Sequence, residues 1–204
     1  LIVTSFTVNK FWSVSTDYIF YSTINGDLNV TDGSTNGDIF YLKGNTINGN
    51  TTLTKNSNAE WRDSDVDPDI YNGDLTLIRN SGGSFHMAYG KPITINGNLT
   101  IKSSASVTFT DTVKFSGSAN ATFEQQSTQS ITIPKMQMKK TGGASLTLND
   151  PMTVSTKLNF NGGNIISSAT NYLLFSDGAG HTDASTSSHV VGVVQKKGDD
   201  AFTF

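Results

Sequence analysis

A repeat of about 24 residues constrains the fold of this chain more than any other feature of its sequence. Four segments align without gaps, and each places an apolar or aromatic residue before an Asn-Gly pair and a short alternating run after it. The segments are Ile24–Val30, Ile47–Leu53, Tyr71–Leu77 and Ile95–Ile101. Their Asn-Gly pairs are 23, 24 and 24 positions apart. A fixed period of this length is typical of stacked repeats, in which each unit buries its apolar face against its neighbours.

Three interleaved series of apolar residues carry the period past the last Asn-Gly pair. The first series is Val30, Leu53, Leu77, Ile101, Phe123 and Leu148, with Leu173 as its loosest member. The second is Ile39/Tyr41, Trp61, Phe85/Met87, Val107/Phe109, Ile131/Ile133 and Val154. The third is Ile47, Ile70, Ile93/Ile95, Val113/Phe115, Met136/Met138 and Leu158/Phe160. Each series alternates with polar residues at a period of two, which predicts three short strands per repeat.

This pattern predicts an all-β fold, a right-handed parallel β-helix (β-solenoid) with three short strands per rung of about 22–25 residues. Equivalent strands of successive rungs would pair in parallel, about 4.8 Å apart. A sandwich of hairpins is the competing fold, because Asn96-Gly97 between two alternating runs is also a hairpin signal. Hairpins give no reason for three apolar series to stay in step over so many copies, so we favour the solenoid.

The period divides the chain into two parts. We predict regular rungs over residues 1–160, and less regular C-terminal rungs or a transition to a next module over residues 161–204. The stretch from Ser176 to Ser188, rich in Ser, Thr, Gly and Asp, predicts a long loop. Both ends of the sequence are strand-like, so we expect a fragment of a longer polypeptide whose adjoining modules are its neighbours.

The Asn-Gly pairs are predicted to form a structural turn ladder at one corner of the coil. Its members are Asn25, Gly26, Asn48, Gly49, Asn72, Gly73, Asn96 and Gly97. Glycine tolerates positive φ, and asparagine visits the left-handed region more readily than most residues. Asn side chains repeated at one corner can also hydrogen-bond from rung to rung.

Composition excludes several classes of protein. The net charge is −3 without a basic face, which argues against nucleic acid as a partner. The chain has no cysteine, so disulfides and thiolate metal sites are excluded. No apolar run approaches the roughly 18–20 residues that direct membrane insertion requires.

Several segments resemble the repetitive regions of very large cell-surface and secreted proteins of the Bacteroidota, including gliding-adhesin-like proteins exported by the type IX system. The segments are Gly44–Ser57, Pro68–Leu77, Leu158–Ile165 and Ser188–Phe204. The resemblance implies a cell-surface or extracellular location, a structural or adhesive stalk, and no catalytic residues. It also implies possible partners among surface glycans and other cell-surface proteins. Asp111-Thr112-Val113 is similar to the O-glycosylation pattern of that phylum, although the same triplet fits a rung corner.

One acidic cluster suggests a metal site. Asp63, Asp65, Asp67 and Asp69 alternate along the chain, and carboxylates at such spacing suit the oxygen coordination of calcium. Pro68 stands where an EF-hand needs glycine, so a calcium-stabilised corner is the hypothesis and a solvated loop is its alternative. We expect no other cofactor.

A carbohydrate-binding or polysaccharide-degrading β-helix is the alternative function. Trp12, Trp61, Tyr71, Phe85 and Tyr89 could form a sugar-stacking strip, but most of them fall on the inward series. Tyr89, beside Gly90 at a corner, is the one expected to be exposed. The histidines His86, His181 and His189 match no metal-ligand spacing, and we expect His86 to point outward. Few charges interrupt the Thr, Ser and Asn of the outer surfaces, so we predict that the chain is not an enzyme.

Overall fold

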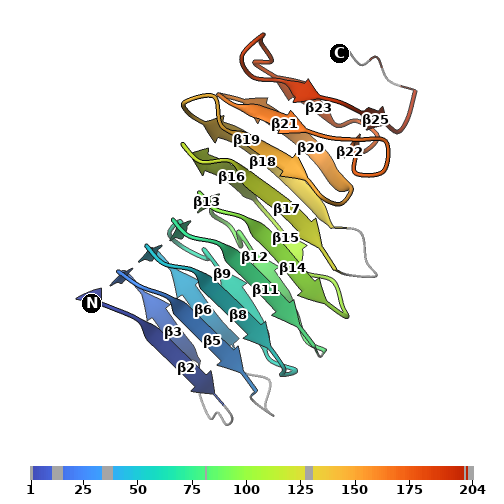
Figure 1. Cartoon of the computed structure of the whole chain (residues 1–204). Helices are drawn as coiled ribbons and strands as arrows, with labels where there is room; N and C mark the ends of the chain where they lie inside the picture. Colours follow the sequence, from blue (N-terminus) through green and yellow to red (C-terminus); the bar gives the residue numbers. More distant parts are fainter. Residues whose placement is uncertain are drawn as a thin grey trace.

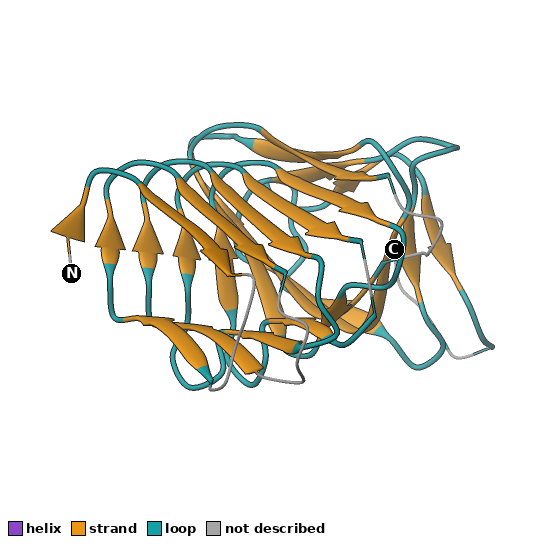
Figure 2. Ribbon diagram, turned by 90° about the horizontal axis from the view of Figure 1, so that it is seen from below, coloured by secondary structure: helices purple, strands orange, loops and turns teal. Residues whose placement is uncertain are grey.

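A computed structural model describes residues 2–10, 16–33, 39–80, 82–126, 131–199 and 201. The described residues form strands that coil into three parallel sheets, with successive rungs following one another from the N-terminus to the C-terminus (Figure 1). Seen from below, equivalent strands lie side by side like the ribs of a coil (Figure 2). Among the described residues, no helix is long and apolar enough to cross a membrane.

In the regular rungs, each sheet receives one strand per rung. Sheet A contains β1 (Ile2–Val3), β4 (Thr23–Ile24), β7 (Thr46–Ile47), β10 (Ile70–Tyr71), β13 (Ile93–Ile95), β16 (Thr112–Gly117), β18 (Thr132–Lys140), β20 (Met152–Phe160), β22 (Leu173–Phe175), β23 (Gly180–Thr182) and β25 (Val194–Lys196). Sheet B contains β2 (Phe6–Lys10), β5 (Leu28–Asp32), β8 (Thr51–Lys55), β11 (Leu75–Arg79), β14 (Leu99–Ser103), β17 (Ala121–Gln125), β19 (Ser145–Leu148), β21 (Asn164–Ile166) and β24 (Val190–Val191). Sheet C contains β3 (Asp17–Phe20), β6 (Ile39–Lys43), β9 (Glu60–Asp63), β12 (Phe85–Met87) and β15 (Thr108–Phe109).

The predicted fold class is confirmed: the protein is a parallel β-solenoid with three strands in a regular rung. Leu53 of β8 pairs with Val30 of β5 on one side and with Leu77 of β11 on the other, and all three residues face inward. The pairing between the named strands is parallel, which excludes the sandwich of hairpins.

The core consists of ladders of like residues stacked along the solenoid axis. Trp61 lies between Phe40 and Phe85, with ring centroids 4.4 and 5.1 Å away, and it is fully buried. Burying one such large apolar side chain stabilises the fold by about 1.5–3 kcal/mol. Because each rung shares these contacts with the next, the stability of any rung depends on its neighbours.

The predicted apolar series are wrong in three strands, β6, β10 and β22. In β6 the buried residues are Phe40 and Leu42, so Ile39 and Tyr41 lie on the other face. In β10 the buried residue is Tyr71 rather than Ile70.

The third error is Leu173, which pairs with Met152 in sheet A and not in sheet B. The spacing from Leu148 to Leu173 matches the period, but Ile165 of β21 takes the sheet B place beside Leu146. In β6 and β10, by contrast, a slip of one residue exchanges the two faces of the strand, and apolar residues on both faces leave that register open in the sequence.

Sheets C and A merge in the C-terminal half. β15 is the last strand of sheet C, and the following rungs replace two short strands with the nine-residue strands β18 and β20. A register shift between Ile133 and Lys135 bends β18 at Pro134, where the backbone has no N–H to donate. β20 then pairs with both β22 and β23. Strands keep stacking beyond residue 160, and the division of the chain at that point stays a prediction.

The corner between sheets A and B carries a ladder of Asn side chains. The amide of Asn48 donates to Asn25 at 3.0 Å, that of Asn72 to Asn48 at 2.7 Å, and that of Asn96 to Asn72 at 2.6 Å. Each bond joins one rung to the next. The ladder therefore satisfies side-chain groups at a corner where the backbone turns too tightly to continue the sheet.

The glycines of this corner serve a different purpose from the predicted one. Gly49, Gly73 and Gly97 are not among the residues with positive φ. A Cβ on Gly73 would lie 2.4 Å from the carbonyl oxygen of Gly49, so the column has no room for a side chain. Close approach of successive backbones, and not backbone conformation, requires glycine here.

Candidate functional site

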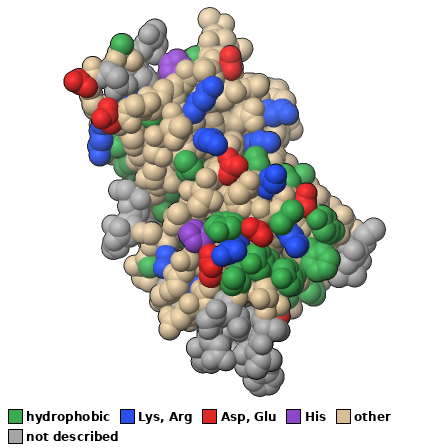
Figure 3. Space-filling model, turned by 180° about the vertical axis from the view of Figure 1, so that it is seen from behind, with side chains coloured by type: hydrophobic (Ala, Val, Ile, Leu, Met, Phe, Trp, Pro, Cys, Tyr) green, Lys and Arg blue, Asp and Glu red, His purple; other side chains and the backbone are tan. Residues whose placement is uncertain are grey.

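An exposed group of aromatic and cationic side chains lies on the outer face of sheet C. Tyr18 is 49% exposed, Phe20 51% and Tyr21 59%. With Tyr41, Lys43, Arg62 and Tyr89 these residues form what we call the sheet C platform. Figure 3 shows hydrophobic side chains gathered on this side of the molecule, with charged side chains among them. Exposed aromatic groups of this kind mark a binding surface more often than a solvated face.

The register of sheet C aligns the platform along the solenoid axis. Tyr18 pairs with Tyr41 across β3 and β6, and Tyr41 pairs with Arg62 across β6 and β9. The rings of Tyr18 and Tyr41 are stacked at 5.0 Å with an angle of 9° between their planes. Phe20 meets Tyr18 edge to face at 6.1 Å. The platform is thus a ladder of rings held one rung apart.

Two cations lie against the rings. The Nζ of Lys43 is 4.9 Å from the Tyr18 ring centroid, and the guanidinium of Arg62 is 4.6 Å from that of Tyr89. Glu60 fixes Arg62 with two hydrogen bonds of 2.9 Å, and this pairing raises the pKa of the guanidinium. Arg62 also donates to the Tyr41 hydroxyl at 3.2 Å. The Tyr18 and Tyr41 rings thus face each other and the cations, and the platform presents ring edges together with the exposed Phe20 and Tyr21 rings.

Tyr21 is held at the edge of the platform by the corner that leads into sheet A. Its backbone has φ of 47°, and its hydroxyl donates to Asp67 at 2.5 Å, two rungs away along the axis. A Cβ on Gly44 would lie 2.7 Å from the Tyr21 ring, so glycine at that position leaves room for the ring. The ring is consequently positioned rather than free to rotate into solvent.

His86 continues the platform toward β12. It pairs with Arg62 and is half-buried on the outer face, with its Nε2 3.6 Å from Glu60. Its ring centroid is 5.2 Å from that of Tyr89. Burial is the main cause that lowers the pKa of His86, so the ring is neutral near pH 7.

The structure divides the four aspartates of the calcium hypothesis between interior and surface. Asp63 and Asp69 are fully buried, whereas Asp65 and Asp67 are half-exposed. Asp63 accepts a hydrogen bond from the Tyr71 hydroxyl at 2.5 Å. Within the described part of the chain, no group of three or more His, Cys, Asp or Glu side chains could hold a metal ion.

Asp69 is the centre of a buried polar network. Its Oδ1 accepts from the backbone N–H and the side-chain amide of Asn45, at 2.7 and 2.8 Å. Its Oδ2 accepts from the backbone N–H and the hydroxyl of Ser64, at 3.0 and 2.9 Å. Asp69 therefore links neighbouring rungs at the corner, and both of its carboxylate oxygens already accept hydrogen bonds from protein donors.

The aromatic residues named from the sequence also divide between the buried core and the surface. Trp61, Tyr71 and Phe85 are fully buried in the core, and Tyr89 is half-exposed at the platform. Trp12 lies outside the described residues. Sequence reasoning placed Tyr41 on the wrong face of β6, and it missed Tyr18, Phe20 and Tyr21 because its second apolar series begins only at Ile39. The alternation in Asp17–Phe20, with Ile19 inward, is the signal that could have found the platform.

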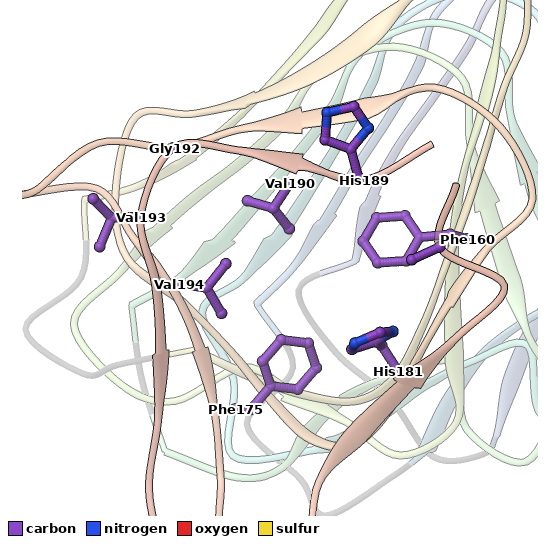
Figure 4. Close-up of a pocket in the computed structure, with 9 residues that line it drawn as sticks. Phe160, Phe175, His181, His189, Val190, Gly192, Val193 and Val194 are labelled. Carbon is purple, nitrogen blue, oxygen red and sulfur yellow. The ribbon is translucent and has the colours of Figure 1, made fainter. Parts of the chain in front are cut away.

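An apolar cavity lies among the C-terminal rungs. A cavity of about 470 Å³ is lined by Phe160, Phe175, Val190 and Val194, with His181 and His189 at its wall (Figure 4). His181 lies against both phenylalanine rings, at 6.2 and 6.4 Å. The cavity is a continuation of the core ladder, and its lining is mainly apolar.

The fold thus places the chain in the class of parallel β-solenoids. No protein-family model, no curated protein and no solved structure matches it.

Proposed function

We propose that this chain is a structural and adhesive module whose solenoid displays a carbohydrate-binding surface and performs no catalysis. The observation that carries the proposal is the sheet C platform, with its stacked and half-exposed Tyr18 and Tyr41 rings. The exposed parts of Tyr18, Phe20 and Tyr21 offer apolar area to the apolar faces of sugar rings, and the donors beside them suit sugar hydroxyls. A location at the cell surface or outside the cell belongs to the same proposal and is supported by the resemblance of the repeats.

The absence of catalysis is proposed from the carboxylates. Glycoside hydrolysis uses two carboxyl groups that flank the substrate. Asp63 and Asp69 are adjacent, but both are buried beneath the corner and hydrogen-bonded by protein donors. Glu60 on the platform forms a salt bridge with Arg62. We therefore favour an adhesive surface over a polysaccharide-degrading one.

The test is binding to a panel of neutral polysaccharides by affinity electrophoresis, followed by calorimetry on the ligands that retard the protein. We expect Tyr18→Ala to weaken binding by about 1–2 kcal/mol, since truncating a central aromatic contact typically costs this much. Tyr172→Ala is the matched control, because this half-buried tyrosine lies before β22 and outside the platform.

Equal losses in the two variants would show that the effect is not specific to the platform. Retention of full affinity by Tyr18→Ala and Tyr41→Ala together would overturn the proposal. Shortening of the polysaccharide during incubation with the protein would replace the adhesive function with an enzymatic one.

A further inference from the structure

The outer face of sheet A carries a concentration of lysines that the proposed function does not use. Lys114 is on β16, Lys135 on β18 and Lys157 on β20, and β18 also carries the exposed Lys139 on the same face. Lys135 and Lys157 are direct partners in the register. Adjacent strands are about 4.8 Å apart, and like charges directly opposite each other are destabilising.

Few acidic side chains neutralise the three lysines. Lys135 approaches Asp111 at 3.5 Å, and within the described part of the chain no ion pair joins Lys114 or Lys157 to an acidic group. The chain as a whole has a net charge of −3. In Figure 3, Lys or Arg side chains lie above the hydrophobic patch, with acidic side chains also among them. A cluster of lysines on one face of a protein with a negative net charge produces a local positive potential, which attracts anions.

The lysines line a shallow, open depression on the surface of sheet A. A groove of about 240 Å³ is formed by Lys114, Lys135 and Lys157 together with Thr112, Gln137 and Asn159, with Met136 also at its wall. We call it the lysine groove. At its C-terminal side Lys157 pairs with Gly180, where an added Cβ would meet nothing within 4 Å, so the groove stays open along the solenoid axis.

The other lining groups are hydroxyls and amides. Gln137 pairs with Asn159, which pairs in turn with Thr182 of β23. The Oδ1 of Asn159 is buried and accepts no hydrogen bond from the described residues. Asn159 is half-buried and lines the groove, so its side-chain oxygen is an unpartnered acceptor at the groove wall. There it needs a donor, which a ligand hydroxyl supplies.

We infer that the lysine groove binds an acidic polysaccharide, with lysines holding carboxylate or sulfate groups and the amides holding sugar hydroxyls. A linear polymer fits because Lys135 and Lys157 are one rung apart along the axis, and Lys114 lies on the preceding rung, two residues along the strand. Nucleic acid fits less well, because no aromatic side chain lines the groove to stack on bases. This site is separate from the sheet C platform, so it goes beyond the proposed function and does not depend on it.

The test measures the affinity of the whole chain for polygalacturonate, dextran sulfate, neutral dextran and single-stranded DNA by calorimetry at fixed ionic strength. The variant is Lys114→Gln/Lys135→Gln/Lys157→Gln. We expect it to bind the two polyanions roughly tenfold more weakly, because contacts of this type are mainly electrostatic. The polyanion that wild-type protein binds more tightly identifies carboxylate or sulfate as the group that is held.

The matched control is Lys91→Gln/Lys102→Gln/Lys197→Gln, which removes the same charge from three exposed lysines elsewhere. We expect it to retain affinity within twofold, and thermal unfolding of both triple variants checks that they are folded. An equal loss in both, or equal binding of neutral dextran, would overturn the inference. Tighter binding of DNA than of either polysaccharide would replace it with a nucleic-acid site.

Tyr18→Ala separates the two sites. If the lysine groove is independent, this variant keeps its affinity for polyanions whether or not it loses affinity for neutral sugars. Loss of polyanion binding in Tyr18→Ala would show a single site at the platform and overturn the assignment to sheet A.

Discussion

Buried polar side chains at the corners show how individual residues hold this solenoid together. Lys140 donates from Nζ to the carbonyls of Ser116 and Ala119, at 2.7 and 2.9 Å, although its residue is almost fully buried. Lys55 does the same for the carbonyls of Ser57 and Gly82, and burial lowers its pKa to about 8. These side chains satisfy turn carbonyls that no neighbouring strand reaches.

The Asp63–Asp69 pair gives a pH-dependent prediction at this scale. Burial, and then the charge of Asp69, raise the pKa of Asp63 well above its usual value, and burial raises the pKa of Asp69. An acid whose folded-state pKa is raised stabilises the fold fully at pH values below its unfolded pKa of about 3.9. That contribution is lost as pH rises toward the folded pKa. We therefore expect the free energy of unfolding to decline from about pH 4 upward.

Asp63→Asn should remove much of this decline, because an amide resembles the protonated acid and can still accept from Tyr71. Near pH 7 the variant should be at least as stable as wild type in urea unfolding. Asp69→Asn should lose about 1–3 kcal/mol, since its amide would face the Ser64 N–H donor. Asp65→Asn, on the half-exposed part of the same loop, is the control. A pH profile for Asp63→Asn parallel to that of wild type would contradict this account.

At the scale of the element, the Asn-Gly-Asp/Asn corner combines three different functions in consecutive residues. The Asn side chain forms a hydrogen bond with the Asn of the next rung, and the Gly leaves room for the backbone of the neighbouring rung. The following Asp or Asn caps the backbone of the next rung, as when Asp27 accepts from the N–H of Asn50 at 2.8 Å. Asn98 does the same for Thr122 after the Asn-Gly pair itself has ended. This third function accounts for the residue type that follows every pair.

Gly73→Ala tests the close-approach explanation. The new Cβ would contact the Gly49 carbonyl, and the backbone would have to shift, so we expect a loss of about 1–3 kcal/mol. Gly180→Ala is the control, because nothing lies within 4 Å of its Cβ position and its φ is not positive. The measurement is thermal or urea unfolding. Equal stability of Gly73→Ala and wild type would mean that the column has more room than the structure indicates.

At the scale of the whole molecule, stacking makes the rung the unit of stability. Each rung contacts the rungs on either side, so removal of one complete rung brings two compatible surfaces together. Deletion of residues 72–95 joins Tyr71 to Asn96-Gly97 and restores the repeat. Deletion of half that length joins strands of different sheets and places apolar residues on the outer face.

We expect the variant lacking residues 72–95 to keep a cooperative unfolding transition and a β-type circular dichroism spectrum, with a lower midpoint in urea. The variant lacking residues 72–83 should lose the transition. Loss of cooperative unfolding in both variants would show that stability is not shared between nearest neighbours.

Much of this architecture could be predicted from the sequence alone. The period of the Asn-Gly pairs and the three apolar series are local patterns. Each is repeated so often that an ambiguous assignment in one strand does not change the predicted fold. They determined the parallel solenoid, its three sheets in the regular rungs and most of its core. The repeats did not reveal the merging of sheets C and A, because the apolar residues of β18 keep their spacing while the turn between them disappears.

The sites depended on tertiary structure. Whether Phe40 or Tyr41 faces inward is decided by the register of β6, which pairs Phe40 with the buried Trp61 and Tyr41 with Arg62 of β9. That choice places Tyr41 beside Tyr18 and creates the platform. The lysine groove likewise depends on register, because Lys135 and Lys157 become neighbours only when β18 pairs with β20. The sequence by itself determined what repeats along the axis, whereas only the tertiary structure decided which side chains from different rungs share a surface, because that depends on pairing over more than 20 residues of chain.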